Sequence, residues 1–237
     1  MCEDHFVTCR APRSELESRQ PSRAPAAHPR GFPMPARIFL SLVSVFVLSV
    51  AAEAIRAEDL SAEEKQQGFQ SLFNGKDFTG WRFVGKGDET KEAPNWKVAD
   101  GVIQLSGGSS PHLSTDREYA DFEMRFEWRG LKERYNSGFF IRSGPKLGSN
   151  QINLAKGHEG VFMAKVTGGV PVPELQKPSG EWNEWRVVVE GEQVTFWSNG
   201  KQAWNVTGLK PSKGYIGLQA EGAPLEFRNL RLREIKK

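Results

Sequence analysis

Two charged side chains stand in strand-like apolar runs, where a charge needs a specific reason. Glu123 lies on the polar side of the strictly alternating stretch DFEMRFEWRG, which spans residues 121–130. Arg142 stands near the end of GFFIRS, an otherwise apolar run. A carboxylate can serve as a general base, and a guanidinium can hold an oxygen of a ligand. The alternatives are that Glu123 faces only water, and that Arg142 pairs with Glu123 or Glu127 on a neighbouring strand.

Three further polar residues lie in loop-like segments, and each could contact a ligand. Asn136 precedes Ser137-Gly138, where turn chemistry is the alternative explanation. Lys177 opens KPSGEWN, where it could act as an electrophile or a base, although a loop lysine is ordinarily solvated. Glu181 in the same motif could instead cap the strand that follows.

A metal site has weak support in the sequence. His158-Glu159 lies in a loop flanked by glycines and offers two metal-ligand types. Two adjacent residues do not easily converge on one ion. We therefore predict no definite cofactor and leave a divalent metal open.

Short runs with a period of two must position these residues. They span residues 102–106, 121–129, 138–143, 184–190, 193–200 and 215–221, with turn signals between them. Gly191-Glu192 predicts a tight hairpin, and Asn199-Gly200 predicts a type I′ turn. The apolar phase slips at Arg228-Asn229, which predicts a β-bulge. Many short strands at close spacing favour an all-β sandwich of antiparallel sheets.

The chain has seven tryptophans, which is many for 237 residues. Trp128 shares the apolar phase of its strand and is expected in the core. The others near turns could offer platforms on which sugar rings stack, or they could fill the core and cap its edges. They are Trp81, Trp96, Trp182, Trp197 and Trp204.

The first 67 residues divide into three segments. Residues 1–33 lack apolar periodicity, so we expect a disordered leader upstream of a true start at Met34. Residues 34–54 have the basic start, apolar run and small-residue end of a secretory signal peptide. An uncleaved N-terminal anchor is the alternative. Residues 55–67 are then a helical or extended lead-in to a domain at 68–237, and the mature protein is expected in the periplasm or secreted, with no stable membrane span.

Charge and cysteine content exclude several functions for that mature chain. Both cysteines, Cys2 and Cys9, lie in the leader, so the remainder has neither a disulfide nor a thiol nucleophile. Residues 58–237 hold 25 basic and 24 acidic side chains, a net charge of +1. No basic stripe tracks along a predicted element, so we do not expect a nucleic-acid partner.

Seven motifs in a fixed order carry a resemblance to a known family. They are SLFNGKDFTGW, NWKVADGVIQL, YADFEMRFEWR, NSGFFIRS, KPSGEWNEWRV, VTFWSNGK and IGLQAEGAPLEFRNLRLREI. Together they resemble the DUF1080 family, also called the 3-keto-disaccharide hydrolase domain, from about Gly68 to Ile235. The resemblance implies a concanavalin A-like jelly roll, which is a β-sandwich of two antiparallel sheets.

The resemblance also implies an enzyme that acts on 3-keto-disaccharides, as a glycoside hydrolase or lyase. A sugar oxidised at C3 has an acidic proton at C2. Its removal expels the group on C1, and water can then add back. Such a reaction needs a base, an electrophile for the enolate oxygen and a donor to the leaving oxygen. Arg142 is the candidate electrophile, and Glu123 is a candidate for the site.

Two further site residues follow only from the family pattern. Gln151 falls where the family usually has Glu-x-Gln, although Ser149 replaces that glutamate. Many members have Asp-His before the glycine of the last motif, where this chain has Ala220-Glu221. We expect Glu221 to replace the histidine as base or metal ligand, and to share one face with Arg142. These departures favour the alternative of a non-catalytic carbohydrate-binding module, and an envelope scaffold is a weaker one.

Overall fold

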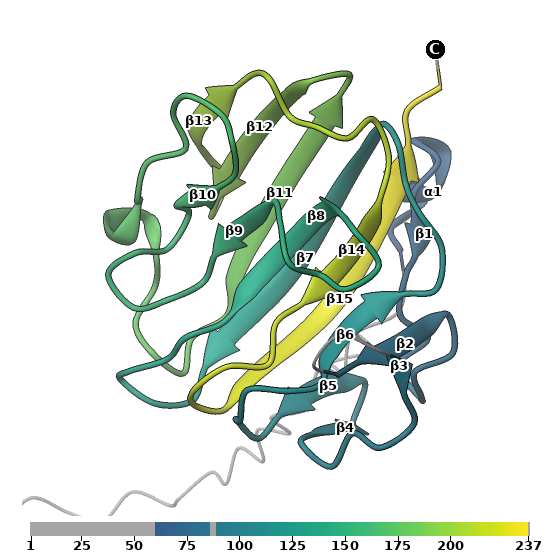
Figure 1. Ribbon diagram of the computed structural model, residues 1–237, viewed down its shortest axis with the longest axis vertical. Helices are drawn as coiled ribbons and strands as arrows, with labels where there is room; N and C mark the ends of the chain where they lie inside the picture. The colour runs from purple at the N-terminus through teal and green to yellow at the C-terminus, as the bar shows by residue number, and fades with distance from the viewer. Residues whose placement is uncertain (1–59, 86–88, 237) are drawn as a thin grey trace, which may run out of the picture. The chain divides into compact units, whose positions relative to one another are not determined.

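The computed structural model describes residues 60–85 and 89–236, which form two antiparallel sheets packed face to face (Figure 1). One sheet has the order β13 (Lys201–Val206), β12 (Gln193–Ser198), β11 (Asn183–Glu190), β7 (Phe122–Gly130), β15 (Leu225–Glu234), β5 (Val102–Leu105) and β4 (Trp96–Ala99), and β1 (Gln70–Ser71) also pairs with β15. We call it the eight-stranded sheet.

The second, seven-stranded sheet has the order β10 (Phe162–Met163), β9 (Gln151–Asn153), β8 (Gly138–Ser143), β14 (Tyr215–Leu218), β6 (His112–Thr115), β2 (Trp81–Val84) and β3 (Glu89–Thr90). The remaining elements are α1 (Ala62–Gln66) and a single 3₁₀ turn, η1 (Pro173–Leu175). The expected all-β jelly-roll sandwich of two antiparallel sheets is confirmed.

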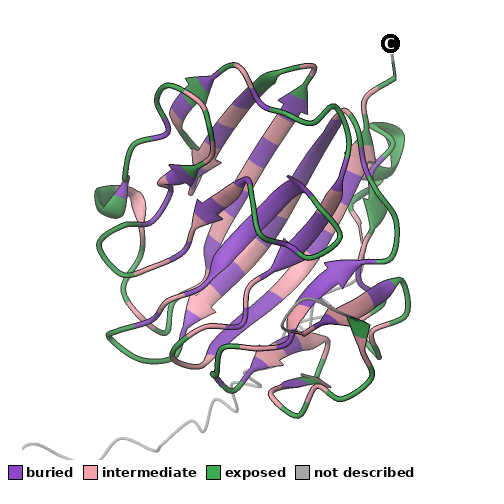
Figure 2. Ribbon diagram, viewed as in Figure 1, coloured by how far each residue is buried: buried purple, intermediate pink, exposed green. Residues whose placement is uncertain are grey.

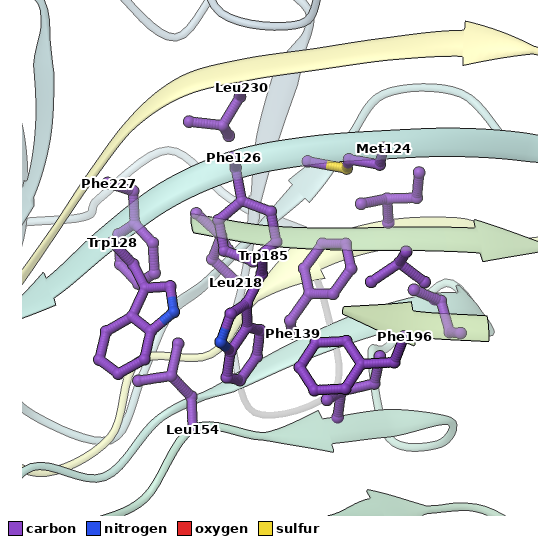
Figure 3. Packing of buried hydrophobic residues seen from close by; sticks show 14 of the residues in the cluster. Met124, Phe126, Trp128, Phe139, Leu154, Trp185, Phe196, Leu218, Phe227 and Leu230 are labelled. Carbon is purple, nitrogen blue, oxygen red and sulfur yellow. The ribbon is translucent and has the colours of Figure 1, made fainter. Parts of the chain in front are cut away.

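The alternation of β7 sets the core of the eight-stranded sheet. Phe122, Met124, Phe126 and Trp128 are all fully buried between the sheets. The ring of Trp185 on β11 meets the ring of Trp128 edge to face, with centroids 5.4 Å apart (Figure 3). Burying each such side chain stabilises the fold by roughly 1.5–3 kcal/mol. The apolar half of the repeat therefore fixes which face of β7 turns inward.

The hairpins follow the turn signals. Gly191-Glu192 joins β11 to β12, and Gly191 has a φ of 58°. Asn199 and Gly200 join β12 to β13 with φ of 49° and 78°, which a type I′ turn requires at both central positions. Both predicted hairpins are confirmed.

The predicted bulge in β15 is also present. The register with β7 shifts between Arg228 and Arg231, and Asn229 has a φ of 53°. The bulge turns two successive side chains to one carboxylate: Glu127 accepts from Arg228 Nε at 2.8 Å and from Asn229 Nδ2 at 2.5 Å. Residues on both sides of the phase slip, from Leu225 to Leu232, thus pack in the core.

The lead-in contains one short helix. Ser61 caps α1, because its Oγ accepts from Glu64 N while Glu64 accepts from the backbone of Ser61. Glu64 also pairs with Arg231 of β15, which ties the helix to the sandwich. No helix within residues 60–85 and 89–236 is long and apolar enough to cross a membrane. The predicted leader and signal peptide, residues 1–33 and 34–54, lie outside the described residues.

Candidate functional site

A row of polar side chains crosses the outer face of the seven-stranded sheet. It contains His112 on β6, Gln219 directly after β14, and Gln151 on β9. Their neighbours Leu113, Leu218 and Ile152 are fully buried between the sheets. Successive side chains of a strand point to opposite faces, so the row faces outward.

Gly138 leaves the space in which two members of the polar row, Gln151 and Gln219, can meet. β8 lies between β9 and β14, yet Gln151 Nε2 donates to Gln219 Oε1 at 3.0 Å. A Cβ at position 138 would stand 2.1 Å from Gln151 Nε2. The two glutamines can therefore meet only because the residue between them has no side chain.

The Gly138→Ala variant tests this arrangement. The new methyl group should displace Gln151 and break its hydrogen bond with Gln219, which is worth roughly 1 kcal/mol. We expect the KM for substrate to rise about fivefold. Gly144→Ala is the matched control, because a Cβ there meets nothing within 4 Å. Equal KM values for both variants and the wild type would show that the glutamine pair does not support binding.

His112 lies at one end of the polar row, where the backbone of Ala220 holds its ring. Its Nδ1 accepts a hydrogen bond from Ala220 N at 3.1 Å. Its ring leans on Phe140, with centroids 5.8 Å apart. Burial lowers the pKa of His112, because the charged imidazolium is poorly solvated there. The ring is therefore neutral at pH 7, and its proton lies on Nε2.

Glu221 is the next residue after Ala220, whose N–H donates to His112. Ala220 is 1% exposed and packs in the core, whereas Gln219 before it and Glu221 after it are partly exposed. Within the described part of the chain, no hydrogen bond or ion pair engages the Glu221 carboxylate. Glu221 is thus a partly exposed carboxylate two residues after Gln219 of the polar row.

Asn136 lies close to the same loop. Its Cβ is 3.3 Å from the position that a Cβ of Gly222 would take, and Gly222 has a φ of 68°. The neighbouring Ser137 Oγ donates to Gln219 O at 2.7 Å. The structure therefore brings the candidate residues Gln151 and Asn136 to the region of Gln219 and of the Glu221-Gly222 loop, and His112 lies at the same loop.

Arg142 does not join this region. It is fully buried, and its guanidinium donates to Ala120 O at 2.6 Å, to Gly191 O at 2.5 Å and to Asp121 Oδ1 at 2.6 Å. These partners tie β8 to the start of β7 and to the β11–β12 hairpin. The prediction that Arg142 and Glu221 share one ligand-facing surface is wrong, because every arm of the guanidinium is used within the protein.

Glu123 lies on the outer face of the other sheet. Its fully buried side chain accepts hydrogen bonds from Arg125, Arg186 and Arg233, at 2.9, 2.6 and 2.7 Å. Burial by itself would raise the pKa of Glu123, but the three guanidinium groups outweigh it and hold this pKa at about 2. The hypothesis that Glu123 faces the substrate is not supported, since arginines cover its carboxylate.

The polar groups of the KPSGEWN loop, residues 177–183, form hydrogen bonds within the loop. Lys177 Nζ donates to Trp182 O at 2.9 Å, and Lys177 N donates to Asn183 Oδ1 at 2.8 Å. Glu181 is exposed, and its backbone N donates to Pro178 O at 3.1 Å. The contacts of Lys177 and Glu181 are thus local, and they bring neither residue to the polar row.

The tryptophans do not form an open platform. Trp81, Trp96 and Trp204 are buried with Trp128 and Trp185. The half-buried Trp182 and Trp197 lie on the outer face of the eight-stranded sheet, where arginine guanidinium groups cover them at 3.9–4.5 Å from the ring centroids. Figure 2 shows the alternation of buried and half-buried positions along these strands.

His158-Glu159 does not form a metal site. Glu159 is fully buried and accepts from Tyr135 Oη at 2.5 Å and from Gly157 N at 2.9 Å, whereas His158 is exposed. Among residues 60–85 and 89–236, no three metal-ligand side chains gather around a common point.

The two packed antiparallel sheets define a jelly-roll β-sandwich, which is the architecture that the family resemblance implied. A family model described as the 3-keto-alpha-glucoside-1,2-lyase-like domain matches residues 68–233. The chain belongs to this family, as the motifs predicted.

One named relative and two solved structures are similar to this chain. A 3-keto-disaccharide hydrolase of Bacteroides thetaiotaomicron is 24% identical over 249 residues, covering 78% of this chain and 84% of the relative. A Parabacteroides distasonis structure, provisionally named a glycosyl hydrolase, is 24% identical, with a TM-score of 0.59 over 76% of this chain and 99% of that one. The carbohydrate-binding module CBM66 of Bacillus subtilis is 14% identical, with a TM-score of 0.50 over 65% of this chain and 96% of that one. The two solved structures share the fold of this chain.

Sequence reasoning missed two members of the row. Gln219 stands in the same motif as Glu221, two residues earlier, and its outward phase could have been read from IGLQAE. His112 gave no local signal, because only the pairing of β6 with β14 brings it beside Ala220.

Proposed function

We propose that this protein cleaves 3-keto-glycosides, with Glu221 as the base. The observation that carries the proposal is the Glu221 carboxylate, which has no partner among the described residues and directly follows Ala220, whose N–H donates to His112. Family membership and the name of the Bacteroides relative support the same substrate class.

The reaction that we propose has two balanced stages. Glu221 takes the proton from C2, the electron pair forms the C1–C2 double bond through the enolate, and the C1–O bond breaks. The leaving oxygen takes up the proton that Glu221 removed and departs as an alcohol or a sugar, which returns Glu221 to its carboxylate form. Water then adds across the double bond, its hydroxyl to C1 and its proton to C2, which gives the free 3-keto-sugar. Gln151 and Gln219 would hold hydroxyl groups of the substrate, because amides both donate and accept.

A substrate comparison tests this function. The purified domain should turn over 3-keto-trehalose or 3-keto-lactose and leave the unoxidised disaccharides intact, because only a C3 ketone acidifies the C2 proton. Parallel reactions with EDTA show whether a divalent metal takes part. Cleavage of unoxidised sugars at an equal rate would contradict the elimination route.

A non-catalytic carbohydrate-binding protein is the second candidate. Its specific support is Ser149, where the family usually has a carboxylate: the Ser149 hydroxyl lies 3.5 Å from Ser143 Oγ and so serves the β8–β9 connection. Binding of keto-sugars without any product would favour this candidate.

We also propose that the protein is exported, on the sequence pattern of residues 34–54. The mature protein should begin between Ile55 and Glu58 and be found outside the cytoplasm. N-terminal sequencing of the exported protein checks this, and an intact segment upstream of Ser41 would contradict it.

A further inference from the structure

We propose that His112 is a catalytic residue whose Nε2–H donates a hydrogen bond to the C3 oxygen of the keto-sugar and of its enolate. This inference rests on the proposed function, because it names the electrophile that such a reaction requires. The sequence assigned this role to Arg142, but Arg142 is buried and every nitrogen of its guanidinium donates within the protein.

The position of His112 brings its ring to the backbone segment that carries the proposed base. Ala220 N lies 3.1 Å from His112 Nδ1, and Glu221 is the next residue in the chain. Gln219, on the other side of Ala220, belongs to the hydrogen-bonded glutamine pair. Because C2 and C3 of a sugar are bonded neighbours, the base and the C3 donor must also be neighbours. His112 and Glu221 meet this requirement through a single backbone residue.

The hydrogen bond from Ala220 determines which nitrogen can donate. A nitrogen that accepts from a backbone N–H carries no proton, so neutral His112 has its proton on Nε2. The ring is wedged against Phe140, which limits its rotation. Nε2–H is therefore a donor with a fixed direction, and it needs no reorganisation when negative charge develops on an oxygen.

The charge state of His112 suits this role. Burial lowers the pKa of the ring, so the donor is a neutral imidazole. A neutral histidine beside a carboxylate base also polarises a carbonyl in triosephosphate isomerase. A permanently charged partner would instead pair with Glu221 and weaken it as a base. The neutral ring stabilises the enolate oxygen and leaves the carboxylate available.

The two cationic side chains that the sequence offered for the role are already engaged. The Arg142 guanidinium is saturated by Ala120, Asp121 and Gly191. The Lys177 ammonium is bonded to Trp182 O within its own loop. The geometry therefore favours His112 over both residues that the sequence offered.

Two substitutions of His112 test the roles of its two ring nitrogens separately. An asparagine side chain ends near the place of Nδ1, so His112→Asn keeps a partner for Ala220 N and loses the outward donor. A glutamine side chain reaches the place of Nε2, so His112→Gln retains an outward N–H. His158→Asn is the matched control, because His158 is the other histidine of the described chain and lies in an exposed loop.

The measurements are kcat, KM and the rate at which C2–H of a 3-keto-glycoside exchanges with deuterium from D₂O. We expect His112→Asn to lose about 10²-fold in kcat and in C2 exchange with less than a threefold change in KM, since one fixed donor to an oxyanion is worth about that much. His112→Gln should recover at least a tenth of the lost rate, and His158→Asn should match the wild type. Circular dichroism and thermal unfolding check that each variant is folded.

Each outcome bears on a different claim. If the wild type exchanges C2–H and His112→Asn does so equally fast, His112 is not the donor and the proposed function still holds. If the wild type neither exchanges C2–H nor cleaves any keto-sugar, the proposed function fails and this role fails with it. If His112→Asn does not fold, ¹⁵N NMR of the wild type decides: a protonated Nδ1 at pH 7 in the keto-sugar complex would overturn the assignment.

Discussion

The Glu221→Gln variant is expected to bind 3-keto-glycosides and to leave them uncleaved. The amide has nearly the shape of the carboxylate but cannot accept a proton from C2. A general base contributes roughly 10²–10⁴-fold to a rate. We expect kcat to fall by about 10³-fold while the dissociation constant for the keto-sugar changes less than threefold. Single-turnover kinetics and calorimetric titration measure the two quantities separately.

The stability of this variant should be unchanged, because the Glu221 carboxylate has no partner within the described residues. Glu133→Gln provides the matched control, since Glu133 is an exposed carboxylate in the loop that precedes Asn136. Wild-type kcat in Glu221→Gln would remove Glu221 as the base. Loss of binding together with activity would point instead to a binding role for the carboxylate.

Glu123→Gln is expected to destabilise the fold by about 3 kcal/mol at pH 7 without changing kcat. The pKa of Glu123 falls from 4.5 to about 2 on folding, and each unit corresponds to about 1.4 kcal/mol. The amide would leave Arg125, Arg186 and Arg233 gathered around a neutral group. Urea unfolding at several pH values measures the loss.

The pH dependence has a definite sign. A carboxyl group whose pKa is depressed by folding stabilises the protein above its unfolded pKa, and this stability is lost as the pH falls toward the folded pKa. The wild type should therefore lose stability between about pH 4.5 and pH 2, whereas Glu123→Gln should lack this part of the decline.

Glu127→Gln is the control on the same face of β7. Its carboxylate contacts Arg228 and Asn229 and is 21% exposed, so water replaces part of the interaction and a smaller loss is expected. Equal destabilisation of the two variants, or unchanged acid unfolding in Glu123→Gln, would show that the buried arginine cluster does not stabilise the fold as inferred.

The sequence by itself determined the sandwich and its local details. The alternation from Phe122 to Trp128 fixed the inner face of β7, because side chains of a strand point alternately to its two sides. Asn199-Gly200 fixed a hairpin, because few residue pairs accept positive φ at both positions. The phase slip at Arg228 fixed a bulge. Each of these features depends on residues that are adjacent in the chain.

The tertiary structure alone decided which charges belong to the site. Glu123 meets Arg186 and Arg233, which lie 63 and 110 positions away in the chain. Arg142 is saturated by Gly191, 49 positions away, and His112 meets Ala220 across 108 positions. The residue types of Glu123 and Arg142 allowed either a catalytic or a structural role. Burial and distant partners decide between those roles, and both are set only when strands far apart in the sequence become neighbours in a sheet.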